Sequence, residues 1–349
     1  MDAPDFTPDW LTAALAPRFP GVRVAGVDVL DRGTATNMRL RLGLTYEEQA
    51  GAPDSLFVKL PPLDPAHRAA LDSSGMGVRE ARFYADLAPS TGLRVPEPYF
   101  VKVSDDGDFV LLLEDLVAGG CEISDGTWGI PGRIAPRALE DLAAMHASFE
   151  DPARRQAVAP WLTRRTEHGS DFALAMMQRV VTEFRDLLTP DYLTVGELYL
   201  EHHQAMESLW DAGPKTVSHG DAHIGNVFVD GDRVGFIDWG LLTVSTPLRD
   251  VSYFLTMSVD PDDRRAMDRD LLRHYLDAWH RHGGSEITFD DAWETYRIHA
   301  TYTVIASFLS LVPPYDTPEV APFGKMFRER SMLALDDLDA VTALRAALA

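Results

Sequence analysis

Apolar and polar residues alternate along several short runs in the first third of the chain, which predicts half-buried strands. The strands are expected at Val22–Leu30, Met38–Thr45, Leu56–Leu60, Tyr99–Val103 and Phe109–Leu113. The last two should form a hairpin, because the Asp- and Gly-rich run between them favours a turn. Helices are expected from Pro8, after a Thr7 cap, and over Gly77–Leu87. Residues 1–115 therefore predict a small antiparallel sheet with few helices.

Beyond an irregular, glycine-rich stretch at Val117–Pro131, apolar residues recur mainly at helical spacing. Helices are expected at Pro136–Phe149, Asp171–Leu188, Tyr192–Trp210, Leu248–Met257, Asp263–His282, Phe289–Leu311 and about Glu319–Leu348. One short hairpin, Val227–Val229 with Val234–Ile237, interrupts them. The pattern predicts an α+β protein with two lobes: residues 1–115, which are sheet-rich, and residues 116–349, which are mainly helical.

The chain has 349 residues, of which 46% are hydrophobic and 25% charged, as expected for a globular protein. Its net charge of −22 disfavours binding to nucleic acid or to anionic membranes. The acidity either serves solubility or attracts a cationic small molecule, and net charge does not decide between the two. No run is long and apolar enough to span a membrane, the N-terminus lacks a signal-peptide pattern, and the single Cys121 fits a reducing compartment. We therefore expect a cytoplasmic protein; its oligomeric state is not specified.

Candidate chemistry is concentrated in the segment from His219 to Asn226. A kinase catalytic loop has this layout, in which an Asp accepts the proton of the substrate hydroxyl and an Asn five residues later binds magnesium. Asp221 and Asn226 have that spacing, and His223 lies between them. Taken singly, these residues are ordinary turn formers. A zinc pair of His219 and His223 is disfavoured, because two glycines in this segment oppose the helix that i, i+4 ligands require.

A second metal ligand is expected at Asp238, which follows an apolar strand and precedes Trp239-Gly240. Asn226 and Asp238 together would supply the oxygen ligands that Mg2+ prefers beside phosphates. His219 is expected to form hydrogen bonds within the loop, and His223 to lie near the acceptor or the metal ligands.

The N-terminal lobe should bind the nucleotide. Lys59 lies on an apolar strand and needs an anionic partner, for which Glu80 on the following helix is the best candidate. The alternatives are a surface charge for Lys59 and a solvated helix face for Glu80. Two further nucleotide contacts are expected: the phosphates at the turn Gly33, Thr34 and Thr36, and the adenine at the hinge from Glu114 to Leu116.

The run from His219 to Asn226, followed by Ile237-Asp238-Trp239, resembles the aminoglycoside phosphotransferase and choline kinase-like superfamily, and the resemblance extends from about Val22 to Leu311. It implies a protein-kinase-like fold, ATP and Mg2+, a small-molecule hydroxyl acceptor, and a structural role for Asp250 in bracing the catalytic loop. The residues around Asn226 look nearer to ecdysteroid-kinase-like members. Gly240 stands where many members have an acidic residue.

The sequence thus predicts an ATP-dependent phosphotransferase that acts on an alcohol group, with Asp221 as the base. The alternative is a catalytically weak pseudokinase or nucleotide-binding scaffold. A protein kinase is disfavoured, because only Leu241–Thr246 separates the Asp-Trp-Gly segment from the next helix, which leaves no room for an activation segment. Four C-terminal residues either line an acceptor pocket or form ordinary aromatic core: Trp293, Tyr253, His299 and Tyr302.

Overall fold

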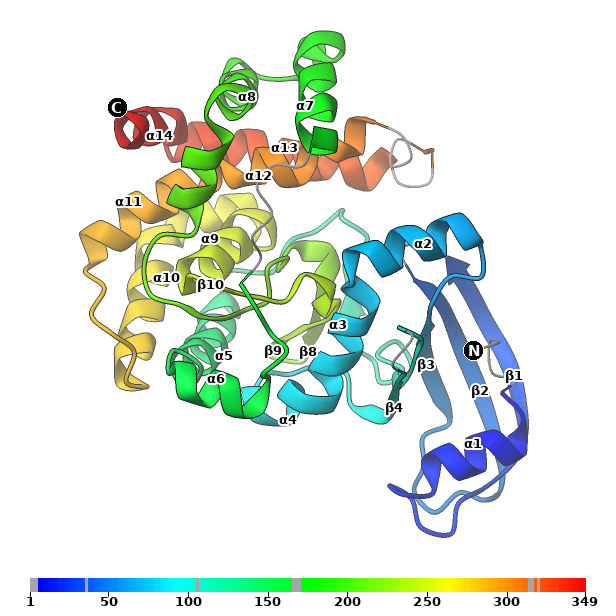
Figure 1. Cartoon of the computed structure of the whole chain (residues 1–349). Coiled ribbons are helices and arrows are strands. Elements are labelled where there is room, and N and C mark those ends of the chain that lie inside the picture. Colours follow the sequence, from blue (N-terminus) through cyan, green and yellow to red (C-terminus); the bar gives the residue numbers. More distant parts are fainter. Residues whose placement is uncertain (1–5, 35–36, 105–106, 165–170, 313–316, 319–320) are drawn as a thin grey trace. The chain divides into compact units, whose positions relative to one another are not determined.

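The structure is a computed structural model that describes residues 6–34, 37–104, 107–164, 171–312, 317–318 and 321–349 (Figure 1). It divides into two compact units. The first comprises Met1–Glu122 together with Gly235–Leu242, and the second comprises Ile123–Val234 together with Thr243–Ala349.

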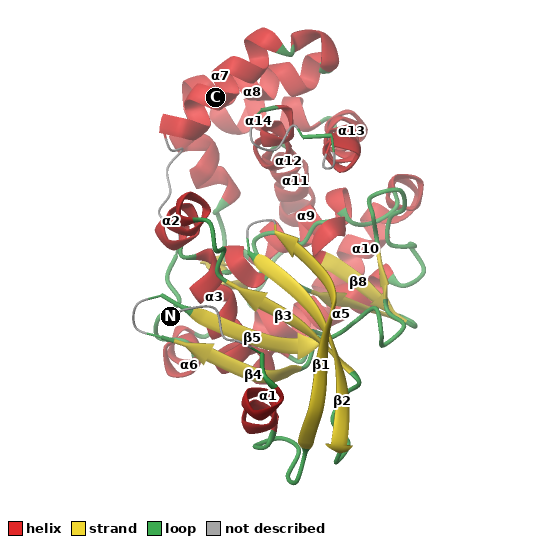
Figure 2. Cartoon of the chain, turned by 90° about the vertical axis from the view of Figure 1, so that its right-hand side faces the viewer, coloured by secondary structure: helices red, strands yellow, loops and turns green. Residues whose placement is uncertain are grey.

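The first unit is built on a five-stranded antiparallel sheet in the order β1-β2-β3-β5-β4. The strands are β1 (Arg23–Thr34), β2 (Met38–Glu48), β3 (Ser55–Leu60), β4 (Pro98–Val103) and β5 (Phe109–Glu114). All five predicted strands are confirmed. β1 and β2, the two longest, lie side by side at one edge (Figure 2). β1 extends beyond its predicted end because Gly33 and Thr34 pair with Arg39 and Met38 of β2.

Helix α1 (Pro8–Leu15) begins as predicted: the Thr7 side chain accepts a hydrogen bond from the Trp10 amide, and proline occupies the first helical position. Its Leu11 and Leu15 join the apolar residues of β2 and β3 in one core. The other helices of the unit are α2 (Pro65–Ser74), α3 (Met76–Arg82) and α4 (Ala88–Thr91). The predicted helix at Gly77–Leu87 is present, but a π-helical turn forms its second half, at Phe83–Leu87.

The second unit is mainly helical, as predicted. Its helices are α5 (Ala135–Ser148), α6 (Pro152–Val158), α7 (Asp171–Glu183), α8 (Pro190–Trp210), α9 (Pro247–Met257), α10 (Pro261–Arg281), α11 (Phe289–Ala300), α12 (Tyr302–Ser307), α13 (Ala321–Asp337) and α14 (Ala340–Leu348). The final predicted helix is divided in two at Asp339, whose positive φ of 46° is incompatible with a continuous α-helix. Among the described residues, no helix is long and apolar enough to cross a membrane.

Short strands hold the segment singled out by the sequence. β7 (Thr216–Ser218) precedes it and pairs with β10 (Thr243–Ser245). β8 (Val227–Asp230) follows it and is the central strand of a three-stranded sheet, between β6 (Glu122–Ile123) and β9 (Arg233–Phe236). Gly231, with a φ of 63°, makes the turn between β8 and β9. The segment from His219 to Asn226 is thus a loop with a strand at each end.

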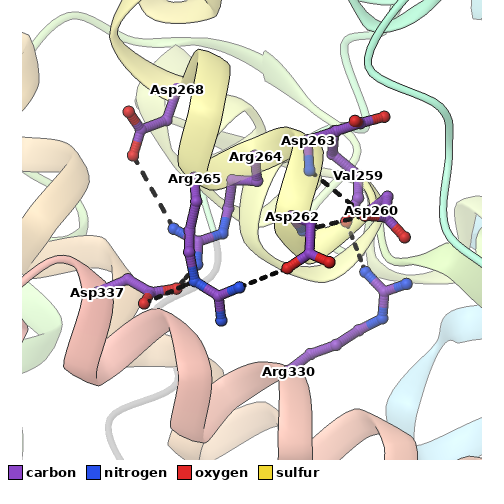
Figure 3. A network of polar contacts seen from close by, with 9 residues as sticks. All are labelled: Val259, Asp260, Asp262, Asp263, Arg264, Arg265, Asp268, Arg330 and Asp337. Atoms are coloured by element: carbon purple, nitrogen blue, oxygen red, sulfur yellow. Dashed lines mark hydrogen bonds and ion pairs between the residues drawn. The ribbon is translucent and has the colours of Figure 1, made fainter.

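Polar contacts fasten α13 to the start of α10 (Figure 3). Asp337 of α13 forms an ion pair with the buried Arg264 and accepts hydrogen bonds of 2.8 and 2.9 Å from Arg265 Nε. Arg330 of α13 donates a 2.7 Å hydrogen bond to the Val259 carbonyl, just before α10. A buried guanidinium is tolerated only when it is paired. The network therefore fixes α13, which carries Phe323 and Phe327 to His223.

Candidate active site

Asp250 of α9 holds the start of the catalytic loop. Its carboxylate accepts hydrogen bonds from Ser218 Oγ (2.8 Å) and from the backbone amides of His219 (2.6 Å) and Gly220 (2.9 Å), and it lies 3.2 Å from His146 Nε2. Burial raises the pKa of Asp250, but the hydrogen bond and charge of His146 and the loop amides outweigh it, so the pKa is lowered. Asp250 is thus positioned as the brace that the family resemblance implies.

The loop orients Asp221 through neighbours on both sides. The Asp221 amide donates to His219 Nδ1 at 3.2 Å. Asn226 Nδ2 donates to the Asp221 carboxylate at 2.9 Å and to its carbonyl at 3.0 Å, and His223 Nε2 lies 3.5 Å from the carboxylate. Burial raises the pKa of Asp221, but His223 and His219 outweigh it and lower the pKa. Asp221 is therefore ionised at neutral pH and can accept a proton.

His223 connects Asp221 to an aromatic cluster. Its Nδ1 accepts a 3.0 Å hydrogen bond from the Gly225 amide, which leaves the Nε2 side facing Asp221. Its ring centroid lies 4.9 Å from that of Phe327 and 5.9 Å from that of Phe323, both on α13. A Cβ atom on Gly225 would lie 2.8 Å from Phe323, so this position requires glycine. The structure brings Asp221, His223 and Asn226 together, while His219 is fully buried and bonded within the loop.

The first unit contains a second polar centre. Lys59 Nζ of β3 lies 2.8 and 2.9 Å from the two carboxylate oxygens of Glu80 on α3, and 3.7 Å from Asp238 Oδ2. Burial lowers the pKa of Lys59, but the charges of Asp238 and Glu80 outweigh it, so the pKa is raised and the ammonium is retained. Burial raises the pKa of Glu80 to about 7, although Lys59 opposes the shift. The predicted Lys59–Glu80 pair is present, and Asp238 lies beside it.

The backbone at Asp238 is unusual. Its φ of 62° and ψ of 68° place it in the left-handed region, which residues other than glycine seldom adopt. Contacts to α3 and the turn after it fix the next two residues: Trp239 stacks on Phe83, with ring centroids 3.7 Å apart, and Arg79 donates a 2.6 Å hydrogen bond to the Gly240 carbonyl. Backbone strain held by its surroundings is common at functional sites and supports Asp238 as a candidate.

Packing explains the glycine at position 240. A Cβ atom there would lie 3.2 Å from Met76 Cβ, tighter than most such contacts. A larger, acidic side chain at Gly240 would displace the start of α3, which carries Glu80.

The predicted phosphate-binding turn is only partly described. Gly33 lies at the end of β1, the side chain of Thr34 is not described, and Thr36 lies outside the described residues. Sequence reasoning missed Arg39, which lies directly opposite both Gly33 on β1 and Lys59 on β3. Directly opposed residues present their side chains on the same face of a sheet, so Arg39 adds a second cation beside Lys59. The alternation of polar and apolar residues along β2 was the sequence pattern that could have indicated Arg39.

The predicted hinge residues already use their polar atoms within the first unit. The Glu114 carboxylate accepts hydrogen bonds of 2.8 and 2.7 Å from Arg94. Leu116 is buried, and its carbonyl accepts a 2.9 Å hydrogen bond from the Cys121 amide. Asp115, the middle residue of the predicted hinge, is 5% exposed and bonded to β2 and β3. Asp115 therefore fixes the segment that follows β5.

The four C-terminal residues considered for the acceptor are not brought together as one set. Tyr253 and Tyr302 lie 5.7 Å apart, and Tyr253 adjoins His223. Trp293 instead packs against Phe289 and the Arg269 guanidinium. His299 is buried, and its pKa is lowered to about 4 by burial and by the charge of Arg249. Of these four residues, Tyr253 is the one whose ring contact with His223 is described.

Within the described residues, no group of three His, Cys, Asp or Glu side chains could hold a metal ion. An ion bound by one carboxylate and one amide would need further oxygen ligands, which phosphates and water supply for Mg2+.

Residues 42–284, well over half of the chain, match the model of the phosphotransferase enzyme family. The chain belongs to the phosphotransferase enzyme family. This family member is a phosphotransferase, and the aminoglycoside phosphotransferase-like resemblance seen in the sequence is confirmed. No curated protein sequence matches it significantly.

Solved structures share its fold. Macrolide 2′-phosphotransferase type I is 19% identical with a TM-score of 0.52, over 91% of this chain and 95% of that one. The GDP complex of wild-type aminoglycoside 2′-phosphotransferase-IIIa is 14% identical with a TM-score of 0.51, over 93% and 98%. An amicoumacin kinase in complex with AMP-PNP, Ca2+ and amicoumacin is 16% identical with a TM-score of 0.54, over 95% of each chain. The predicted kinase-like α+β fold of this phosphotransferase is thus confirmed.

Proposed function

We propose that this phosphotransferase moves the γ-phosphoryl group of ATP onto a hydroxyl group of a small molecule, with Asp221 as the catalytic base. The observation that carries the proposal is the Asp221 carboxylate: it is ionised, its orientation is fixed by Asn226 and His223, and its loop is held by the buried Asp250. Phosphoryl transfer depends on such positioning more than on covalent chemistry.

Asn226 and Asp238 would hold Mg2+, which neutralises charge on the ATP phosphates when it is bound. Both hydrogen bonds described for the Asn226 side chain use its Nδ2, so its Oδ1 is the atom suited to a metal. Lys59, held by Glu80, would bind phosphate oxygens as a cation. Asp221 would take the proton of the acceptor hydroxyl, whose oxygen bonds to the γ-phosphorus while the bond from that phosphorus to ADP breaks.

The named ligands of structurally similar enzymes suggest which compounds to test. Those enzymes act on a macrolide, an aminoglycoside or amicoumacin, and two of the structures contain GDP or AMP-PNP. We propose a nucleoside triphosphate as the donor and an antibiotic or metabolite with a free hydroxyl as the acceptor.

The test is ADP or GDP formation by the full chain with MgATP or MgGTP and single acceptors. The panel contains macrolides, aminoglycosides, amicoumacin, choline, ethanolamine and sugars, each also run with EDTA. We expect acceptor-dependent, EDTA-sensitive product with at least one compound. A magnesium-dependent thermal shift with ATP but no transfer to any acceptor would instead identify a nucleotide-binding scaffold, and no shift at all would contradict both.

The Lys59–Glu80 pair makes activity depend on pH. Because the pKa of Glu80 is raised to about 7, this carboxyl gains a proton and loses its charge as the pH falls through 7, which releases Lys59. We expect kcat/KM for MgATP to fall as the pH drops below 7. The Glu80→Gln variant should lack this acidic limb of the pH profile and should also be less active than the wild type at pH 8. The kcat/KM profile reports ionisations of the free enzyme. A Glu80→Gln variant with the same acidic limb as the wild type would show that another group causes it.

A further inference from the structure

The hydroxyl of Tyr253 is buried next to the Asp221 carboxylate. Tyr253 lies on α9 and is 3% exposed, and among the described residues its Oη makes no hydrogen bond of ordinary length and angle. A buried hydroxyl without a partner costs free energy that a phenylalanine at the same place would not. A tyrosine is therefore a poor choice here for packing alone, and a ligand oxygen beside Asp221 could give its hydroxyl a well-formed hydrogen bond.

The surroundings place this hydroxyl beside the candidate base. The Tyr253 ring lies edge-to-face with His223, centroids 6.3 Å apart, and His223 Nε2 lies 3.5 Å from the Asp221 carboxylate. Burial, the negative charge of Asp221 and a side-chain interaction with its carboxylate raise the pKa of Tyr253 well above its usual range, so the hydroxyl keeps its proton and is a donor. The second ring in contact, Tyr302, lies 5.7 Å away and is itself covered by the Arg249 guanidinium.

An alcohol oxygen at this position would satisfy both groups. It carries one O–H, which Asp221 can accept, and two lone pairs. One lone pair can accept a hydrogen bond from Tyr253, and the other is then directed at the phosphorus. Fixing the nucleophile in this way is the orientation effect on which phosphoryl transfer depends.

We propose that Tyr253 is an acceptor-binding residue whose hydroxyl donates a hydrogen bond to the oxygen of the reacting hydroxyl group. The proposal rests on the proposed function. The proton passes from the acceptor oxygen to Asp221, the new oxygen–phosphorus bond forms, and the bond between the γ-phosphorus and ADP breaks with its electron pair remaining on ADP. Tyr253 keeps its proton throughout.

The experiment compares two isosteric changes, Tyr253→Phe and Tyr192→Phe. Tyr192 is the matched control: it is also fully buried in the second unit, but its hydroxyl is bonded to Ser307 Oγ at 2.9 Å. Each variant is assayed with the compound that gives the highest rate in the acceptor panel, and its unfolding temperature is measured with and without MgATP.

We expect Tyr253→Phe to lower kcat/KM for the acceptor roughly tenfold, as for the loss of one hydrogen bond, with an unchanged KM for MgATP. Its unfolding temperature should equal or exceed that of the wild type, because a buried hydroxyl without a well-formed hydrogen bond has been removed. Tyr192→Phe should show the opposite pattern, with lower stability and normal transfer.

Two results would overturn the inference: transfer by Tyr253→Phe at the wild-type rate, or a loss of activity matched by a loss of stability like that of Tyr192→Phe. An inactive wild type, in contrast, would overturn the proposed function itself and this inference with it. The two failures are therefore distinguished by the wild-type assay.

Discussion

Asp221→Asn is expected to lower the rate of phosphoryl transfer by about 10²- to 10⁴-fold, the range attributed to a general base. The amide keeps the shape of the carboxylate and can still accept the hydrogen bond from Asn226 Nδ2, so the loop should keep its conformation. The amide does not accept a proton at neutral pH. Turnover should therefore fall while MgATP still raises the unfolding temperature as in the wild type.

The matched control for this change is Asp232→Asn. Asp232 lies in the turn between β8 and β9 and its side chain is 80% exposed, so the same chemical change there should leave transfer within about twofold of the wild type. Initial rates with the best acceptor, at saturating MgATP, make the comparison. Near-normal turnover by Asp221→Asn would refute the base assignment and leave the nucleotide-binding proposals untouched.

Asp250→Ala is expected to destabilise the protein by about 3–5 kcal/mol, the cost of removing one partner from a buried charged network. The change leaves the Ser218 hydroxyl, two loop amides and His146 without their acceptor. Because the pKa of Asp250 is lowered in the folded state, its contribution is present at neutral pH and is lost as the pH falls below the usual range of a carboxyl.

Urea unfolding at pH 7 measures this loss, with Asp270→Ala as the control. Asp270 is exposed and, among the described residues, pairs with the exposed Arg273, so its removal should cost less than about 1 kcal/mol. If Asp250→Ala does not fold, Asp250→Asn, which keeps one acceptor oxygen, gives an intermediate value. Equal midpoints for the Asp250→Ala and Asp270→Ala variants would show that the brace contributes nothing to stability.

Much of the fold could be predicted from the sequence because its signals are local. Alternation identified the strands of the first unit, and helical spacing identified most helices of the second. The contact between Lys59 and Glu80 was also predictable, since a buried ammonium needs a carboxylate and α3 offers one close in the sequence.

The remaining features depend on contacts between distant segments. β7 and β10 have three residues each, too few to show an alternation of apolar and polar positions. They form strands because they pair with each other. The partner of Asp250 at His146 lies on α5, and no spacing in the sequence indicates that pairing. Likewise, the left-handed conformation of Asp238 occurs next to Trp239, which stacks on Phe83, a contact that only the folded unit provides.

The way the chain is shared between the two units limits how the protein can be divided for experiments. Gly235–Leu242 belongs to the first unit, although Ile123–Val234 of the second unit separates it from Glu122 in the sequence. A fragment ending at Glu122 would therefore lack Asp238 and Trp239. In such a fragment Phe83 would lose its stacking partner and Lys59 one of its two carboxylate neighbours. Studies of the isolated sheet unit therefore require Gly235–Leu242 to be grafted back or supplied as a peptide.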